Sequence, residues 1–350
     1  MEKFPLSSFT LGLAIIGALV LAALVAWQTW TSRRNTPRQA LQDAAAPAAD
    51  PTDPLGGRAE PRFESDTDPA PLPVMDKRPG LDALIDIIAP IVLETPASGE
   101  AALAAMPTTR RAGSKPFAVE GLSVETGEWE QPHGGRRYSA FQAGVQMANR
   151  TGALNEIEYS EFVMKAQAFA DAVNGSPEFP EMLHEVARAR ELDQFASGHD
   201  AQLGFTLRAR NAAWSPGYVQ QNAARLGFVS GVIPGRMVLP AQVQGLPPVL
   251  GLSFDTQAAM AEDPAQSAIR EVTLSLDVPQ VDRSERPFVR MRESAIALAA
   301  AMDGLITDDN GQVIRLESLD GIGADLEQLY DTLDGRDLSA GSVLARRLFS

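Results

Sequence analysis

Single-residue alternation of apolar and polar side chains marks the strands expected between residues 200 and 335. It runs through DAQLGFTLRAR (200–210), PVLGLSFD (248–255) and EVTLSLDVP (271–279), a pattern typical of half-buried strands. Further strands are expected at 228–233 and 236–239. A hairpin turn is expected at Asp309-Asn310-Gly311, because Asn-Gly suits the tight turn between two strands.

Helical spacing separates these strands. Ser215-Pro216 is a typical helix start, and Gly227 is expected to end that helix. Apolar residues step by three and four from Phe288 to Met302, and again from Leu319 to Leu333. The resulting order, βαββββαβα, predicts an α+β fold in which helices cover one face of an antiparallel sheet.

Residues 81–198 are also expected to fold, as a second α+β region. Apolar strand-like runs occur at 84–93, 116–124 and 138–149, and a helix from about Phe162 is followed by another from about Met182. ADAVNG, at 170–175, resembles AAAMDG, at 299–304, and each closes a helix. This similarity predicts a degenerate repeat at a spacing of about 129 residues, with chance likeness between Ala-rich helices as the alternative.

The N-terminus carries the longest uncharged segment. From Phe9 to Trp30 there is no charged residue, and Arg33-Arg34 follow. About 20 apolar residues suffice to cross a bilayer, so residues 9–30 are expected to be a transmembrane helix. The alternative, a cleaved signal peptide, has a shorter apolar core. The excess of arginine after the span predicts a single-pass protein with residues 1–8 outside the cytoplasm and the bulk of the chain inside it.

Residues 31–80 are rich in Pro, Ala and Asp and contain few large apolar side chains. Such a composition cannot bury enough surface to offset chain entropy, which predicts a disordered linker. Its root-mean-square span would be about 40 Å and its taut length about 160 Å. The segment is therefore expected to be a tether, and residues 336–350 a C-terminal tail.

Charge and composition exclude several classes of function. The net charge of −15 disfavours nucleic-acid binding, and the absence of cysteine excludes disulfides and thiolate chemistry. The three histidines, His133, His184 and His199, lie far apart in sequence and lack motif partners. We therefore expect no catalytic residue, no metal or cofactor site, and no small-molecule substrate.

Five segments of the C-terminal region, taken with the N-terminal span and linker, together resemble a known family. These segments are AQLGFTLRAR, GYVQQNAARLGFVSGVIPG, PPVLGLSFD, REVTLSLDVPQ and AAAMDGLITDDNGQVI. This arrangement resembles the ZipA family of bacterial division proteins, with residues 199–335 as the C-terminal domain. The resemblance implies binding of the C-terminal tail of FtsZ, the bacterial tubulin homologue, at the open face of the sheet. It also implies that the chain tethers FtsZ to the inner membrane during septum formation.

The strand alternation predicts which residues occupy that open face. Leu203, Phe205, Leu250, Leu252 and Leu274 are expected under the helices. Small and polar side chains remain on the other face, with two larger apolar residues to receive a docked tail. The predicted peptide-binding set is Thr206, Arg208, Ile233, Val249, Gly251, Ser253, Thr273 and Ser275.

Three functional hypotheses follow from the sequence. The first is a membrane-anchored tether for FtsZ, with the bilayer and the FtsZ tail as its partners. The second is a membrane-anchored enzyme with a carboxylate-based site. The third reverses the topology and gives a periplasmic module that binds the cell envelope.

Overall fold

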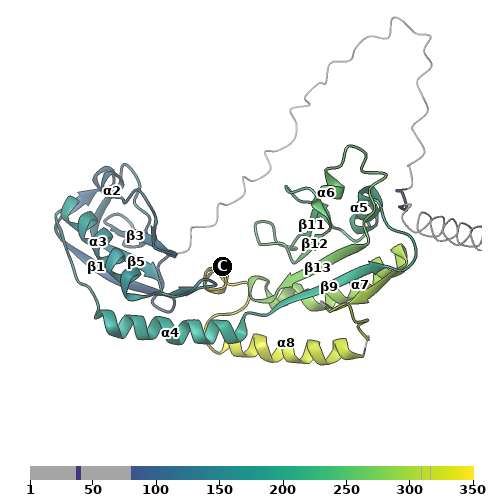
Figure 1. Cartoon of the computed structure of the whole chain (residues 1–350). Helices are drawn as coiled ribbons and strands as arrows, with labels where there is room; N and C mark the ends of the chain where they lie inside the picture. The colour runs from purple at the N-terminus through teal and green to yellow at the C-terminus, as the bar shows by residue number, and fades with distance from the viewer. Residues whose placement is uncertain (1–36, 41–79, 309, 316) are drawn as a thin grey trace, which may run out of the picture.

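The computed structural model describes residues 37–40, 80–308, 310–315 and 317–350, which form two lobes (Figure 1). Residues 80–199 are called the N-terminal lobe here and residues 200–342 the C-terminal lobe. Each lobe contains helices and an antiparallel sheet, so the α+β prediction is confirmed at that level. The expected transmembrane helix lies outside the described residues. Within them, no helix combines the length and apolar character needed to cross a bilayer.

The sheet of the C-terminal lobe has the strand order β10-β11-β12-β13-β9-β14, with all its pairs antiparallel. Its strands are β9 (Gln202–Ala209), β10 (Val229–Ser230), β11 (Arg236–Leu239), β12 (Leu250–Ser253), β13 (Glu271–Asp277) and β14 (Gly304–Thr307). Its helices are α5 (Pro216–Ala224), α6 (Thr256–Ala259), α7 (Pro287–Met302) and α8 (Ser318–Asp334), with 3₁₀ turns at Val278–Gln280 and Arg283–Glu285. The predicted order βαββββαβα is confirmed, with the four-residue α6 as an addition.

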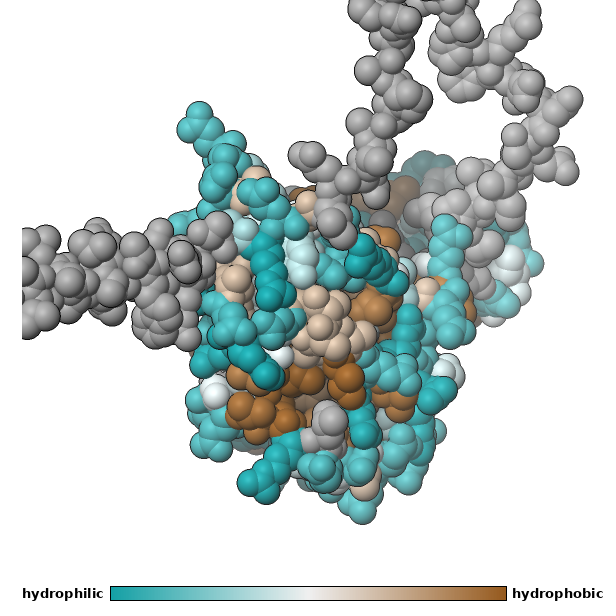
Figure 2. Space-filling view, turned by 90° about the vertical axis from the view of Figure 1, so that its right-hand side faces the viewer, coloured by the Kyte–Doolittle hydropathy of each residue, from teal (hydrophilic) through white to brown (hydrophobic). Residues whose placement is uncertain are grey.

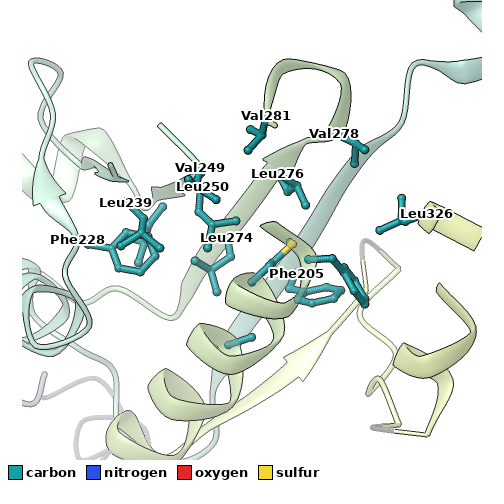
Figure 3. Packing of buried hydrophobic residues seen from close by; sticks show 14 of the residues in the cluster. Phe205, Phe228, Leu239, Val249, Leu250, Leu274, Leu276, Val278, Val281 and Leu326 are labelled. Carbon is teal, nitrogen blue, oxygen red and sulfur yellow. The ribbon is translucent and has the colours of Figure 1, made fainter. Parts of the chain in front are cut away.

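Alternate residues of this sheet form the core of the C-terminal lobe. Met237, Leu252, Leu274 and Phe205 are cross-strand neighbours in one row, and all four are buried. Helix α7 contributes apolar side chains to the same cluster, which Figure 3 shows around Phe205 and Leu274. Because successive side chains of a strand point to opposite faces of the sheet, the residues before and after each of these four along its strand point away from the helices.

The N-terminal lobe has the sheet order β2-β3-β5-β1-β8, with β4 paired to β3. Its main strands are β1 (Asp86–Ser98), β3 (Lys115–Ser123), β5 (Arg137–Gln146) and β8 (Gly175–Pro177). The shorter ones are β2 (Arg111–Ala112), β4 (Trp129–Glu130), and the separate pair β6 (Ala148–Asn149) and β7 (Gly152–Ala153). Its helices are α2 (Gly99–Ala105), α3 (Glu156–Ala172) and α4 (Met182–His199). A core of Ile91, Phe141, Phe162 and Phe169 lies between the sheet and its helices.

The two lobes share one connectivity. Strands β3-β5-β1-β8 correspond to β12-β13-β9-β14, and helices α2, α3 and α4 correspond to α5, α7 and α8. At the ends of α3 and α7, Asn174 (φ 54°) and Asp303 (φ 56°) both adopt the left-handed conformation. Each is followed by a glycine that begins a strand paired with the first strand of its lobe. The segments ADAVNG and AAAMDG therefore occupy the same place in the two folds.

The C-terminus differs from the expected tail. Residues Val343–Leu348 form helix α9, and Leu348 and Phe349 are buried. Gln146 of the N-terminal lobe donates to the Arg347 carbonyl (2.8 Å), and Gln280 of the C-terminal lobe donates to the Phe349 carbonyl (2.7 Å). The segment is folded because both lobes bind it, which its own sequence pattern did not reveal.

The expected linker also needs a correction at one point. Residues 37–40 lie against the C-terminal lobe, where Arg38 forms a parallel bridge with Trp214. The Arg38 amide donates to the Ala213 carbonyl (2.7 Å), and the Ser215 amide donates to the Arg38 carbonyl (2.9 Å). Composition alone assigned this stretch to a disordered linker because its partners are distant in sequence.

Candidate functional site

The open face of the C-terminal sheet is built from rows of cross-strand neighbours, whose side chains point the same way. Ser253, Thr273 and Thr206 form one row. Gly251, Ser275 and Gly204 form the next row. The helix-facing residues Leu252 and Leu274 flank these positions along their strands. Thr206, Gly251, Ser253, Thr273 and Ser275 therefore share the face that the alternation predicts.

One end of this face is hollowed into a groove of about 450 Å³. Gly251 and Ser275 line it, and a β-carbon placed on Gly251 would approach the Ser275 hydroxyl oxygen to 2.6 Å. Phe349 and Ser350 line it from the C-terminus, and Arg150 lines it from the N-terminal lobe. The groove thus includes groups from both lobes and from the end of the chain.

Arg150 is held at this end by two carboxylates. Its guanidinium lies 2.6 Å from Asp200 and 2.7 Å from Asp277. The hydrogen bonds that Arg150 donates to Asp200 and Asp277 raise the pKa of its guanidinium, so it is a fixed cation. Because both acids already bind it, Arg150 supports the wall of the groove rather than offering a free charge.

Two predicted residues differ from their expected positions. Val249 lines the groove but is only 1 % exposed, because it packs in the core cluster that also contains Val281 and Phe349. Ile233 belongs to no strand: β10 ends at Ser230, and Ile233 lies in the turn that leads to β11, half exposed. The positive φ of Gly235 shows where this turn closes, so the expected strand at 228–233 is too long.

Arg208 lies on the open face but is already paired. Its Nε is 3.2 Å from a carboxylate oxygen of Glu271, its cross-strand neighbour. An acidic group of a ligand would have to compete with Glu271 for this guanidinium. The expected contact between Arg208 and an acidic tail is therefore weaker than a free arginine would provide.

Three residues of the face, Gly204, Val229 and Val238, were missing from the predicted set. Val238 neighbours Gly251 across the strands, and Val229 neighbours Val238, so both extend the row of Gly251, Ser275 and Gly204. Val229 is half exposed, and Val238 is partly exposed. The alternation of Met237 and Leu239 with Val238 was the signal that could have identified it.

The equivalent face of the N-terminal sheet is more apolar. Val92, Ala140, Leu122 and Trp129 are consecutive cross-strand neighbours on the side away from α3. Val92 is 61 % exposed and Trp129 is 43 % exposed. The corresponding positions of the C-terminal lobe include the Arg208–Glu271 pair. Sequence reasoning missed this row because β4 is only two residues long.

Leu81 covers the other end of that N-terminal face. Its amide donates to Glu120 (3.0 Å), and its side chain lies where a β-carbon on Gly144 would be. Gly144 therefore permits the chain to cross the sheet closely before β1 begins. The apolar row from Val92 to Trp129 lies beyond Glu120 along the strands and remains accessible.

Several ionisable groups in the described part of the chain are held by buried hydrogen bonds or ion pairs. Lys115 is buried, which lowers its pKa, and its ammonium donates to Ser114, Asn149 (3.0 Å) and Thr151. Burial raises the pKa of Asp86, although Arg347 binds its carboxylate at 2.5 Å. Within the described residues, no three His, Asp or Glu side chains are grouped so that they could hold a metal ion.

Each of the three histidines contacts residues close to it in the sequence. His184 lies beside Glu185 (3.2 Å), and His199 stacks on Phe195 and contacts its carbonyl. The amide of His133 donates to the Tyr138 hydroxyl. Each of these contacts is with a residue no more than five positions away in the sequence.

Figure 2 shows the end of the molecule formed by the C-terminal lobe, where apolar residues gather in a region bordered by hydrophilic ones. Such a border is typical of surfaces that bind other molecules. No protein-family model matches the chain, and the comparison with curated proteins gives no significant match.

Proposed function

We propose that this chain is a ZipA-like division protein that binds the C-terminal tail of FtsZ and tethers FtsZ polymers to the bacterial inner membrane. In this proposal residues 9–30 span the bilayer, the N-terminus is periplasmic, and both lobes are cytoplasmic. The uncharged N-terminal segment followed by Arg33 and Arg34 supports the anchor and its orientation. The helix-backed sheet with one open face supports a binding role.

The observation that carries the proposal is the row Val229–Val238–Gly251–Ser275–Gly204. Two glycines and a serine leave room above the sheet, and the valines offer apolar contact at one side. Phe349 and Ser350 line the groove together with Gly251 and Ser275. An extended segment with apolar side chains would fit such a surface, with Ser and Thr hydroxyls available for its backbone groups.

Gly251→Asp tests the location of this site. The new side chain would displace the Ser275 hydroxyl and place negative charge in the groove. Because a few residues dominate peptide contacts, we expect the affinity for an FtsZ-tail peptide to fall about tenfold or more, equivalent to about 1.4 kcal/mol. Fluorescence anisotropy measures the affinity, and thermal unfolding checks that the variant is folded.

Val92→Asp is the matched control on the N-terminal lobe. Val92 is exposed on the equivalent sheet face, so the substitution adds the same charge there without opening the core. We expect it to leave tail binding unchanged. Normal binding by folded Gly251→Asp would contradict the proposed site, and loss of binding in Val92→Asp alone would assign the tail to the N-terminal face.

A further inference from the structure

Residues 37–40, called the strap here, form a docked segment on the C-terminal lobe. Backbone hydrogen bonds join Arg38 to Ala213 and Ser215. Trp214, between them, is fully buried and bridges to Ile269 on its other side. The strap therefore adds a short strand-like segment to backbone that the core already fixes.

Side chains reinforce this docking. The Arg38 guanidinium lies 3.0 Å from the Asp303 carboxylate and 3.4 Å from the Met302 carbonyl, at the end of α7. The Trp214 indole donates to the same carbonyl (2.8 Å). Pro37 is buried. These contacts connect the strap to the helix end as well as to the backbone of 213–215.

The position of the strap in the sequence gives it a consequence for the bilayer. Only residues 31–36 separate it from the uncharged segment 9–30. Fully extended, residues 31–36 span at most about 20 Å, whereas residues 31–80 would span about 160 Å. Docking at Arg38 thus shortens the connection to the C-terminal lobe severalfold.

We propose that the strap holds the C-terminal lobe against the lipid surface, so that the chain is a short-range anchor and not a long tether. This inference rests on the proposed function only for the location of residues 9–30 in a membrane. The inference specifies which lobe lies near the bilayer. It also limits the distance between the bilayer and a partner bound to that lobe. The docking itself involves no membrane and can be tested separately.

A disulfide between positions 40 and 217 tests the docking. A β-carbon built on Gly217 lies 3.7 Å from that of Ala40, close to the roughly 3.8 Å of natural disulfides, and the chain contains no cysteine. We expect full-length Ala40→Cys/Gly217→Cys to form an intramolecular disulfide under mild oxidation, seen by peptide mapping. Gln39→Cys/Gly217→Cys is the control, because Gln39 is exposed, and it should cross-link far less.

Two results would overturn the docking. Persistently free thiols at positions 40 and 217 would show that the strap does not lie on its own lobe. Disulfide-linked dimers would show that it belongs to the lobe of another copy. Neither result depends on FtsZ, so failure of the strap is distinguishable from failure of the proposed function.

Energy transfer to the bilayer tests the consequence. Full-length protein carrying a donor dye at Gln220→Cys, an exposed position on α5, is reconstituted into phosphatidylcholine–phosphatidylglycerol vesicles that contain acceptor lipid. Arg38→Glu should repel Asp303, release the strap and cause loss of energy transfer, whereas Gln39→Glu should retain it. Equal energy transfer in both variants would overturn the short-range anchor. Failure of the protein to float with vesicles would instead overturn the membrane location of residues 9–30.

Discussion

At the residue scale, Glu158 connects three parts of the N-terminal lobe. Its carboxylate accepts hydrogen bonds from the amide and hydroxyl of Ser114, both at 2.8 Å, and from the Asn155 amide at the start of α3. Burial acts to raise the pKa of Glu158, but the hydrogen bonds from Ser114 and Asn155 and the charge of Lys115 outweigh it. The pKa therefore lies below its ordinary value.

The sign of this shift gives a prediction for Glu158→Gln. A carboxylate whose folded pKa is depressed stabilises the fold above its unfolded pKa, near 4.5, and loses that contribution as the pH falls through the folded pKa. We expect Glu158→Gln to lower the free energy of unfolding by about 1–3 kcal/mol at pH 7, with a smaller difference from wild type in acid. Urea unfolding at several pH values measures this.

Glu178→Gln is the control for that experiment, since Glu178 is exposed on the segment before α4. It should change stability little at any pH. A loss in Glu158→Gln that is the same at neutral and acidic pH would show that the carboxylate charge is not what stabilises this junction.

At the scale of elements, the junction between a long helix and an edge strand occurs once in each lobe. Asn174 and Asp303 end α3 and α7 in the left-handed conformation, and Gly175 and Gly304 then begin β8 and β14. The two residues differ in their surroundings. Asp303 binds Arg38 (3.0 Å) and Asn211 (3.1 Å), whereas Asn174 is exposed.

Glycine substitutions at these two junctions should therefore act in opposite directions. Asn174→Gly removes the steric cost of a β-carbon at positive φ and should stabilise the protein by about 0.5–1 kcal/mol. Asp303→Gly gains the same relief but loses the partners of Arg38 and Asn211, so we expect a net loss of about 1 kcal/mol. Chemical denaturation of both variants measures these changes, and gains of equal size would contradict the difference in their roles.

The local pattern of apolar and polar residues was sufficient to predict the strands and helices that pack within their own lobe. The alternation in 200–210, 248–255 and 271–279 predicted Phe205, Leu250, Leu252 and Leu274 as core residues, and all four are buried, whereas Leu203 is half-buried. The open face followed from the same alternation. The helix spacing in 288–302 likewise matches α7.

Contacts between distant segments could not be predicted in this way. Val249 belongs to the same buried cluster as Val281 and Phe349, and no periodicity of the sequence connects it to them. Arg38 lies in a Pro- and Ala-rich stretch, and its partners are at 213–215 and 303. Ile233 was misplaced because the sequence does not show that strand β10 ends at Ser230. In each case the deciding neighbour is far away in sequence, or the element is too short to show a period.

At the scale of the whole molecule, the end of the chain joins the lobes. Arg347 binds Asp86 at 2.5 Å, and Arg150 extends from the N-terminal lobe to Asp200 and Asp277. Helix α4 begins in the N-terminal lobe, and its last turns pack on the core of the C-terminal lobe (Figure 1). The groove at Gly251 is bounded by Arg150, Phe349 and Ser350, so its shape depends on this union.

The most direct test of the proposed function is whether vesicles that carry the full-length protein recruit FtsZ polymers through the FtsZ tail. Purified FtsZ assembled with GTP is mixed with these vesicles and floated through a density gradient, beside FtsZ that lacks its C-terminal tail. We predict that intact FtsZ floats with the vesicles and that the truncated form stays at the bottom with protein-free controls. Equal flotation of both forms, or of neither, would contradict an anchor that binds the FtsZ tail.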